Sequence, residues 1–156
     1  MSILLTKEGY KEYKQQIEKE KQKILEAGLI KREANEQAPG DGWHDNFLHE
    51  DATRLEKGAM HNIKTLVEKE KDIKIVNKHN KEDCVDIDDN LLIEFIYDVD
   101  DKETEELKLV GNYLPKDNEI TLNSPLGKAI YNKKIGSTVD YKVNGKKINV
   151  NILKKL

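Results

Sequence analysis

The stretch that decides the fold is Ala38-Pro39-Gly40-Asp41-Gly42-Trp43-His44-Asp45-Asn46, which separates two long helix-forming segments, residues 6–38 and 46–76. Both segments are rich in Lys, Glu, Leu, Ile and Ala, whereas the stretch between them holds a proline and two glycines. Proline cannot donate a backbone hydrogen bond and glycine adopts dihedral angles that other residues avoid, so we expect the chain to reverse here. The sequence therefore predicts an antiparallel helical hairpin over residues 1–76, with an acidic tip at 39–46.

The two predicted helices carry matching seams, because apolar residues recur at steps of three and four. Thr6 is expected to cap the first helix. Polar residues interrupt both seams, which gives an imperfect coiled-coil pattern. The reversal lets one seam cover the other, so we expect a monomer, with a coiled-coil dimer as the alternative. The seam positions are Tyr10, Tyr13, Ile17, Glu20, Ile24, Ala27, Lys31 and Ala34, and then Leu48, Ala52, Leu55, Ala59, Asn62, Leu66, Lys69 and Ile73.

The second half of the chain changes to a period of two, which is typical of strands. Strands are predicted at 91–97, 106–110 and 119–122, and a helix is expected to start at Ser124-Pro125, with serine as its cap. Asn144-Gly145 predicts a type I′ turn that pairs Tyr141 with Ile148 and Val139 with Val150. We therefore expect an α+β protein whose second domain, residues 80–156, is a small antiparallel sheet with one helix. Residues 77–89 are expected to be a polar link.

Composition narrows the classes of function. The chain of 156 residues has a net charge of only −3, which does not indicate a nucleic-acid binder. One cysteine, Cys84, excludes a disulfide framework and fits a reducing, cytoplasmic setting, and the N-terminus is too short and too soon charged for a signal peptide. There is no phosphate-binding glycine loop, no nucleophile elbow and no zinc-ligand spacing. A self-contained enzyme site is therefore not expected.

The tip remains as the candidate for chemistry. In its structural interpretation, Asp45 caps the second helix, Asp41 belongs to the turn, and Trp43 packs against the neck of the hairpin. In its functional interpretation, Asp41 and Asp45 converge on one Mg²⁺, because this ion prefers hard oxygen ligands and often completes its coordination with groups from a partner. Composition alone leaves both interpretations open.

Several stretches resemble the bacterial GreA/GreB transcript-cleavage factors. These are Leu5-Thr6-Lys7-Glu8-Gly9-Tyr10, the tip residues Gly40-Asp41 and Asp45-Asn46, residues 50–58, and Asn123-Ser124-Pro125-Leu126-Gly127-Lys128-Ala129-Ile130. The resemblance implies an N-terminal antiparallel coiled coil followed by an FKBP-like domain. It also implies a transcription elongation factor, not itself an enzyme, that meets nucleic acid only through RNA polymerase.

The resemblance further implies a role for each candidate residue. Asn123, Ser124 and Pro125 would contact the polymerase while the coiled coil enters its secondary channel. Asp41 and Asp45 would help to hold a catalytic Mg²⁺ that is shared with the polymerase and is not bound stably by the factor alone. Gly40, Trp43 and Asn46 would support the tip. The polymerase's own active site would then hydrolyse backtracked RNA from its 3′ end.

One departure from the family pattern supports a second hypothesis. The family's tip usually carries its second acid, a glutamate, three residues after the first, whereas Asp45 lies four residues after Asp41. The alternative is a Gre-like regulator that occupies the channel without stimulating cleavage. Remoter alternatives are a coiled-coil scaffold and an FKBP-like prolyl isomerase. An isomerase pocket needs an aromatic lining, and the aromatic residues of this domain are Phe95, Tyr97, Tyr113, Tyr131 and Tyr141.

Overall fold

The computed structural model describes residues 2–37 and 47–156 of the chain. It has a long helical hairpin and a domain with a curled sheet, which confirms the predicted α+β class. Contacts divide the chain into two compact units, Tyr13–Asp72 and Met1–Glu12 together with Ile73–Leu156. The first twelve residues therefore fold with the C-terminal domain, whereas the sequence grouped them with the hairpin.

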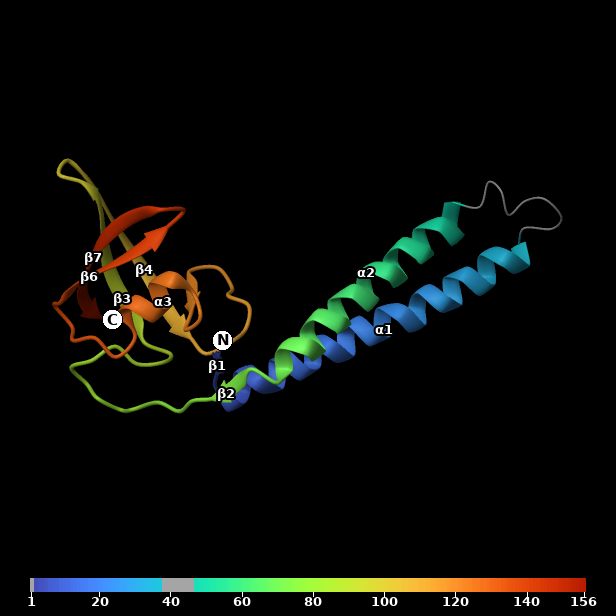
Figure 1. The fold of residues 1–156 in the computed structure, drawn as a ribbon, viewed down its shortest axis with the longest axis horizontal. Coiled ribbons are helices and arrows are strands. Elements are labelled where there is room, and N and C mark those ends of the chain that lie inside the picture. Colours follow the sequence, from blue (N-terminus) through green and yellow to red (C-terminus); the bar gives the residue numbers. More distant parts are fainter. Residues whose placement is uncertain (1, 38–46) are drawn as a thin grey trace. The chain divides into compact units, whose positions relative to one another are not determined.

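The hairpin consists of α1 (Lys7–Gln37) and α2 (Phe47–Glu70) (Figure 1). Thr6 caps α1 as predicted, since its Oγ1 accepts a hydrogen bond from the N–H of Gly9 at 3.0 Å. Seven predicted seam residues are buried, which supports the steps of three and four. They are Tyr13, Ile17, Glu20 and Ala27 on α1, and Ala52, Ala59 and Leu66 on α2.

Polar contacts fix the register of the two helices. The Tyr13 hydroxyl donates to the carbonyl oxygen of Leu66 at 2.5 Å, and Asn62 Nδ2 donates to Glu20 Oε2 at 3.3 Å. A third contact, Lys31 Nζ to Glu56 Oε2 at 3.2 Å, joins α1 and α2 nearer the tip. The polar seam residues Glu20, Lys31 and Asn62 therefore make contacts between the two helices.

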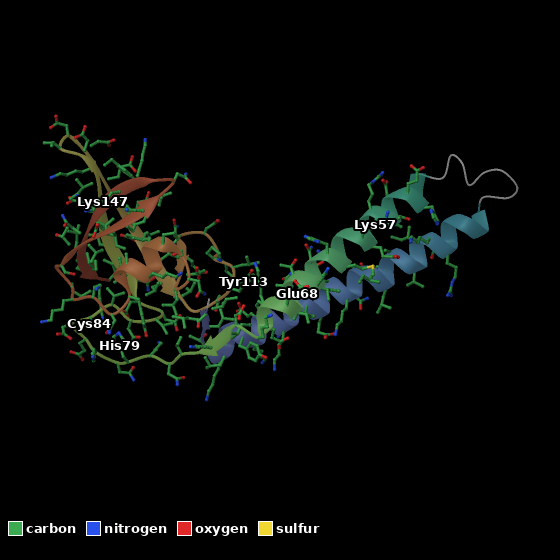
Figure 2. All side chains as sticks on the ribbon, viewed as in Figure 1. Lys57, Glu68, His79, Cys84, Tyr113 and Lys147 are labelled. Atoms are coloured by element: carbon green, nitrogen blue, oxygen red, sulfur yellow. The ribbon has the colours of Figure 1, made fainter. Side chains whose placement is uncertain are left out.

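The outer surface of the hairpin is strongly polar, and exposed side chains such as Lys57 and Glu68 project from α2 (Figure 2). Leu55 was predicted to lie in the seam, but 42% of it is exposed. Its neighbour Glu56 is the residue that contacts Lys31 of α1. No helix in the described part of the chain is long and apolar enough to cross a membrane.

The prediction that the second helix continues to residue 76 is wrong. α2 ends at Glu70, and the N–H of Asp72 donates to the carbonyl oxygen of Lys69 in the turn that follows. Ile73–Ile75 then forms β2, which pairs in parallel with β1 (Ile3–Leu5). The β-branched Ile73 and Ile75 favour this extended conformation.

The C-terminal sheet has the order β5-β4-β3-β7-β6. Its strands are β3 (Asn90–Asp98), β4 (Asp101–Val110), β5 (Glu119–Thr121), β6 (Thr138–Val143) and β7 (Lys146–Lys155). Every predicted strand is present, but β4 and β5 pair in parallel, so the sheet is mixed instead of wholly antiparallel. The β6–β7 turn has positive φ at Asn144 (51°) and Gly145 (80°), and Tyr141 pairs with Ile148 as predicted.

The core of this domain lies between the sheet and α3 (Pro125–Ile130). Two of its fully buried members, Val85 and Ile87, come from the segment 77–89. The prediction of a simple link there is wrong, because the alternation of these two apolar residues with polar ones places them inside the domain. The buried core residues are Val85, Ile87, Leu91, Ile93, Phe95, Leu109, Leu122, Leu126, Ile130, Val150 and Ile152.

Candidate functional site

The acidic tip predicted at 39–46 lies outside the described residues. This applies to Asp41 and Asp45 and to the supporting residues Gly40, Trp43 and Asn46. Over residues 2–37 and 47–156, no group of three or more His, Cys, Asp or Glu side chains is placed to hold a metal ion. The tip residues and the Mg²⁺ assigned to them therefore stay predictions.

The corner where β5 leads into α3 holds the three residues predicted to contact a partner. Ser124 caps α3, since its Oγ accepts from the N–H of Gly127 at 3.0 Å and donates to the carbonyl oxygen of Thr121 at 2.8 Å. Pro125 occupies the first helical position and is exposed. The predicted helix start is confirmed, and Pro125 is the most accessible of the three residues.

Asn123, next to this corner, is engaged within the domain. Its Oδ1 accepts from the N–H of Leu4 at 2.7 Å, and its Nδ2 donates to the carbonyl oxygen of Leu4 at 3.0 Å. Leu4 precedes Asn123 by 119 residues, so sequence spacing gave no indication of this contact. The structure thus gives Asn123 an internal role, and its predicted contact with a partner stays a prediction.

Sequence reasoning missed a second surface, the half-exposed end of the sheet face that carries Phe95. Phe95 and Tyr97 stack with their ring centroids 6.3 Å apart, and 47% of Tyr97 is exposed. Glu103 pairs with Phe95 in the β3–β4 register, so its side chain shares this face. We call Phe95, Tyr97, Glu103 and Glu105 the aromatic–acidic face.

Electrostatics connect the members of this face. Burial raises the pKa of the Tyr97 phenol, and the carboxylates of Glu103, Glu105 and Asp101 raise it further. Burial also raises the pKa of Tyr141 on β6, with added contributions from Tyr97 and Glu105. A surface that combines the exposed ring of Tyr97 with carboxylates suits a partner that presents apolar and basic groups. Alternating apolar residues on β3 opposite acids on β4 were the available sequence signal.

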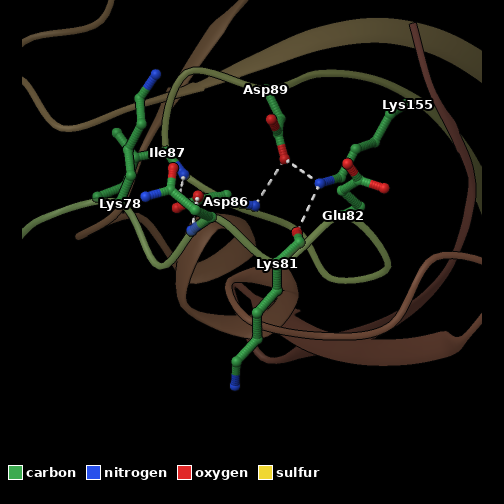
Figure 3. A pocket seen from close by; sticks show the side chains of 8 residues that line it. Lys78, Lys81, Glu82, Asp86, Ile87, Asp89 and Lys155 are labelled. Carbon is green, nitrogen blue, oxygen red and sulfur yellow. Dashed lines mark hydrogen bonds and ion pairs between the residues drawn. The ribbon is translucent and has the colours of Figure 1, made fainter.

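The loop 77–89 is organised by a buried carboxylate, that of Asp86, which is 5% exposed (Figure 3). Its oxygens accept from the backbone N–H groups of His79 at 3.2 Å, Asn80 at 2.9 Å and Ile87 at 2.7 Å. Burial acts to raise the pKa of Asp86, but these hydrogen bonds and the nearby His79 outweigh it, so the pKa lies below its usual value. Asp86 therefore stays ionised and holds the loop.

A shallow pocket opens beside this loop, lined by Lys78, Lys81 and Lys155 and by the carboxylates of Glu82, Asp86 and Asp89 (Figure 3). Lys155 Nζ lies 3.0 Å from Asp89 Oδ2 and donates to the carbonyl oxygen of Lys81 at 3.1 Å. Lys78 Nζ lies 3.5 Å from Asp88 Oδ2. Since the lining holds as many carboxylates as lysines, the pocket has no excess of positive charge that would attract an anion.

The Asp86 contacts predict an acid-dependent loss of stability. Asp86→Asn should lower the free energy of unfolding of the C-terminal domain by about 2–3 kcal/mol at neutral pH. The carboxylate accepts three N–H groups with two oxygens, whereas the asparagine amide has only one acceptor oxygen and places an NH2 donor where the other stood. Because the folded pKa of Asp86 is depressed from 3.8, its stabilisation is present above pH 4 and is lost as the pH falls through the folded pKa.

Urea titrations of wild type and Asp86→Asn between pH 2.5 and 6 measure this dependence. The difference in unfolding free energy should be constant above about pH 5 and should shrink below pH 4. A difference that does not change over this range would show that the charge of Asp86 is not what stabilises the loop.

Comparison with known proteins finds one matching family and several similar structures. Residues 80–154 match the family model described as "Transcription elongation factor, GreA/GreB, C-term". Among solved structures, the GreA factor homolog 1 (Gfh1) protein of Thermus thermophilus is 22% identical, with a TM-score of 0.43, over 100% of this chain and 99% of that chain. Gfh1 of Thermus aquaticus is 21% identical, with a TM-score of 0.44, over 99% and 97%.

A prokaryotic transcription elongation factor GreA/GreB from Nitrosomonas europaea is more distant, at 18% identity and a TM-score of 0.37, over 68% of this chain and 91% of that chain. At these scores the structural similarities carry no argument about function. No curated protein matches the chain.

Proposed function

We propose that this chain, whose residues 80–154 match the GreA/GreB C-terminal family model, is a transcription elongation factor of that family and binds RNA polymerase through its C-terminal domain. The observation that carries the proposal is the family match over 80–154, which includes the exposed Pro125 corner and the aromatic–acidic face. A protein of this kind has no active site of its own and acts by altering the activity of the polymerase.

In this proposal the helical hairpin carries the residues that act on the polymerase active site. We assign the stimulation of RNA cleavage to Asp41 and Asp45, which follow the end of α1 and precede the start of α2. Their carboxylate oxygens are of the type that Mg²⁺ prefers, and two such groups would be partial ligands that need the polymerase to complete the set. A bound Mg²⁺ supplies charge stabilisation at the phosphodiester and lowers the pKa of a water molecule.

A second function is supported by the spacing of these two acids. Asp45 lies four residues after Asp41, and its side chain is one methylene shorter than that of glutamate. A tip that cannot place both carboxylates on one ion would still occupy the channel. The protein would then be a Gre-like regulator that binds without stimulating cleavage, and a cleavage assay on backtracked complexes separates the two functions.

The docking surface can be tested with two proline variants. Pro125→Glu should weaken binding to RNA polymerase at least tenfold if the corner is the contact, because it replaces an apolar ring with a charge that must be desolvated. The helix should remain, since glutamate is favourable in the first turn. Pro115→Glu is the matched control, because Pro115 is an exposed proline of the same domain.

Titration of labelled full-length protein with polymerase gives the dissociation constants. Equal affinities for wild type, Pro125→Glu and Pro115→Glu would exclude the corner. Tyr97→Ala in the same titration tests the aromatic–acidic face, and a loss of binding there alone would move the contact to that face. Turnover of a proline peptide would favour the isomerase alternative. Sedimentation tests the proposed monomer, and a stable dimer would favour a scaffold.

A further inference from the structure

We propose that Asn123 is a positioning residue that clamps the N-terminal strand, and through it the first turn of α1, to the C-terminal domain. The carboxamide makes two hydrogen bonds to one residue, Leu4, as acceptor at 2.7 Å and as donor at 3.0 Å. The carboxamide of Asn123 thus offers Leu4 one acceptor and one donor, as the backbone of a neighbouring strand would.

The clamp completes a strand that is otherwise paired on one side. β1 is only three residues long, and β2 pairs with it in parallel in the register Leu4 to Lys74. A parallel pair of three residues on each strand has little stability by itself. Asn123 bonds both backbone groups of the central residue of β1, Leu4, from a part of the chain 119 residues away.

The residues that follow Leu4 are held in succession as far as α1. Leu5 is fully buried, and its carbonyl oxygen accepts from the N–H of Val76 at 2.9 Å. Thr6 donates its N–H to the carbonyl oxygen of Gly111 at 3.0 Å. Gly9, in the first turn of α1, approaches so closely that an added Cβ would lie 2.0 Å from that same carbonyl oxygen. The first turn of α1 therefore packs directly against the segment around Gly111 in the same domain.

This arrangement gives two neighbouring residues different tasks. Pro125 is exposed at the corner proposed to dock, whereas Asn123 faces inward to the strand that leads into α1. Resting on the proposed function, the inference is that Asn123 transmits docking of the domain to the base of the hairpin. It should affect what the hairpin does on the polymerase and not how tightly the domain binds.

The test compares three full-length variants by hydrogen exchange of backbone amides. Asn123→Ala removes both hydrogen bonds. Asn123→Asp is isosteric but lacks the donor while ionised, and protonation of its carboxyl group restores an O–H donor toward Leu4. Ser124→Ala is the matched control, because it also removes two hydrogen bonds at this corner without touching Leu4.

In Asn123→Ala the protection factors of the Leu4 and Thr6 amides should fall about tenfold or more, while Ser124→Ala leaves them within about twofold of wild type. In Asn123→Asp protection should be low at pH 7 and should recover toward pH 4, whereas Asn123→Ala shows no such recovery. Unchanged protection of Thr6 in Asn123→Ala, or no pH-dependent recovery in Asn123→Asp, would overturn the clamp.

The polymerase supplies a second readout. Asn123→Ala should keep its half-saturating concentration within about twofold of wild type and lose at least about two-thirds of the effect at saturation. A loss of affinity without loss of the saturating effect would contradict a positioning role. A wild-type protein without any effect on polymerase would defeat the proposed function alone, because the exchange experiment needs no polymerase.

Discussion

Replacing Asp41 or Asp45 with alanine is expected to reduce cleavage of backtracked RNA about 100-fold or more, to the level of the polymerase alone. Binding to the polymerase should stay within about twofold, because the proposed contact lies on the C-terminal domain. A tip carboxylate adds little to folding beyond one helix cap of about 1 kcal/mol. Its large effect on activity would arise only when the polymerase completes the ligand set of the ion.

The measurement is the rate of 3′ cleavage in stalled, backtracked complexes at several Mg²⁺ concentrations. Asp51→Ala is the control, because Asp51 lies on the exposed surface of α2 and the variant makes the same change of charge outside the tip. Asp45→Glu lengthens the second acid and should retain cleavage. If wild type binds and gives no cleavage above that of the polymerase, the function is that of a channel-binding regulator.

Local patterns were sufficient to predict most elements of the fold. The steps of three and four placed Tyr13, Ile17 and Ala27 in the helical seam, and all three are buried. Asn144-Gly145 fixed the last hairpin, because both residues tolerate the positive φ that a type I′ turn requires. Each of these signals acts within a few residues of its own position, so a single sequence contains it.

The errors involve partners that are distant in the sequence. Ile73–Ile75 continues the helical pattern by composition, yet it pairs with Ile3–Leu5, which precedes the hairpin in the sequence. Val85 and Ile87 stand in a polar, acidic segment, yet they complete the core under α3. Neither partner could be found by periodicity, because tertiary packing overrides local preference in short segments.

The candidate site was predicted unevenly for the same reason. Ser124-Pro125 is recognisable as a helix start from two adjacent residues, and the structure has it there. Asn123 lies beside them, but its two hydrogen bonds go to Leu4, and only the folded chain reveals them. The three N–H donors that surround Asp86 likewise come from both sides of a loop without regular secondary structure.

Replacing Gly127 with alanine is expected to lower the stability of the C-terminal domain by about 3 kcal/mol or more. Gly127 is buried in the first turn of α3, and an added Cβ would lie 1.9 Å from the carbonyl oxygen of Thr121 and 2.9 Å from Ser124 Oγ. The nearer of these atoms is a backbone oxygen, and the Ser124 side chain is held by its hydrogen bonds in the cap. The clash must therefore displace α3, which covers the core.

Gly28→Ala is the matched control, because Gly28 is exposed on α1 and an added Cβ would meet nothing within 4 Å. Alanine should stabilise that helix by about 1 kcal/mol, since glycine is a poor helix former. Hydrogen exchange at Ile93 and Ile152, which pair in the centre of the sheet, reports on the C-terminal domain alone. Gly127→Ala should accelerate exchange there about 100-fold and Gly28→Ala should not change it. Unaltered exchange in Gly127→Ala would mean that α3 can move without loss of the core, and Pro125 would then stand on a mobile helix instead of a fixed corner.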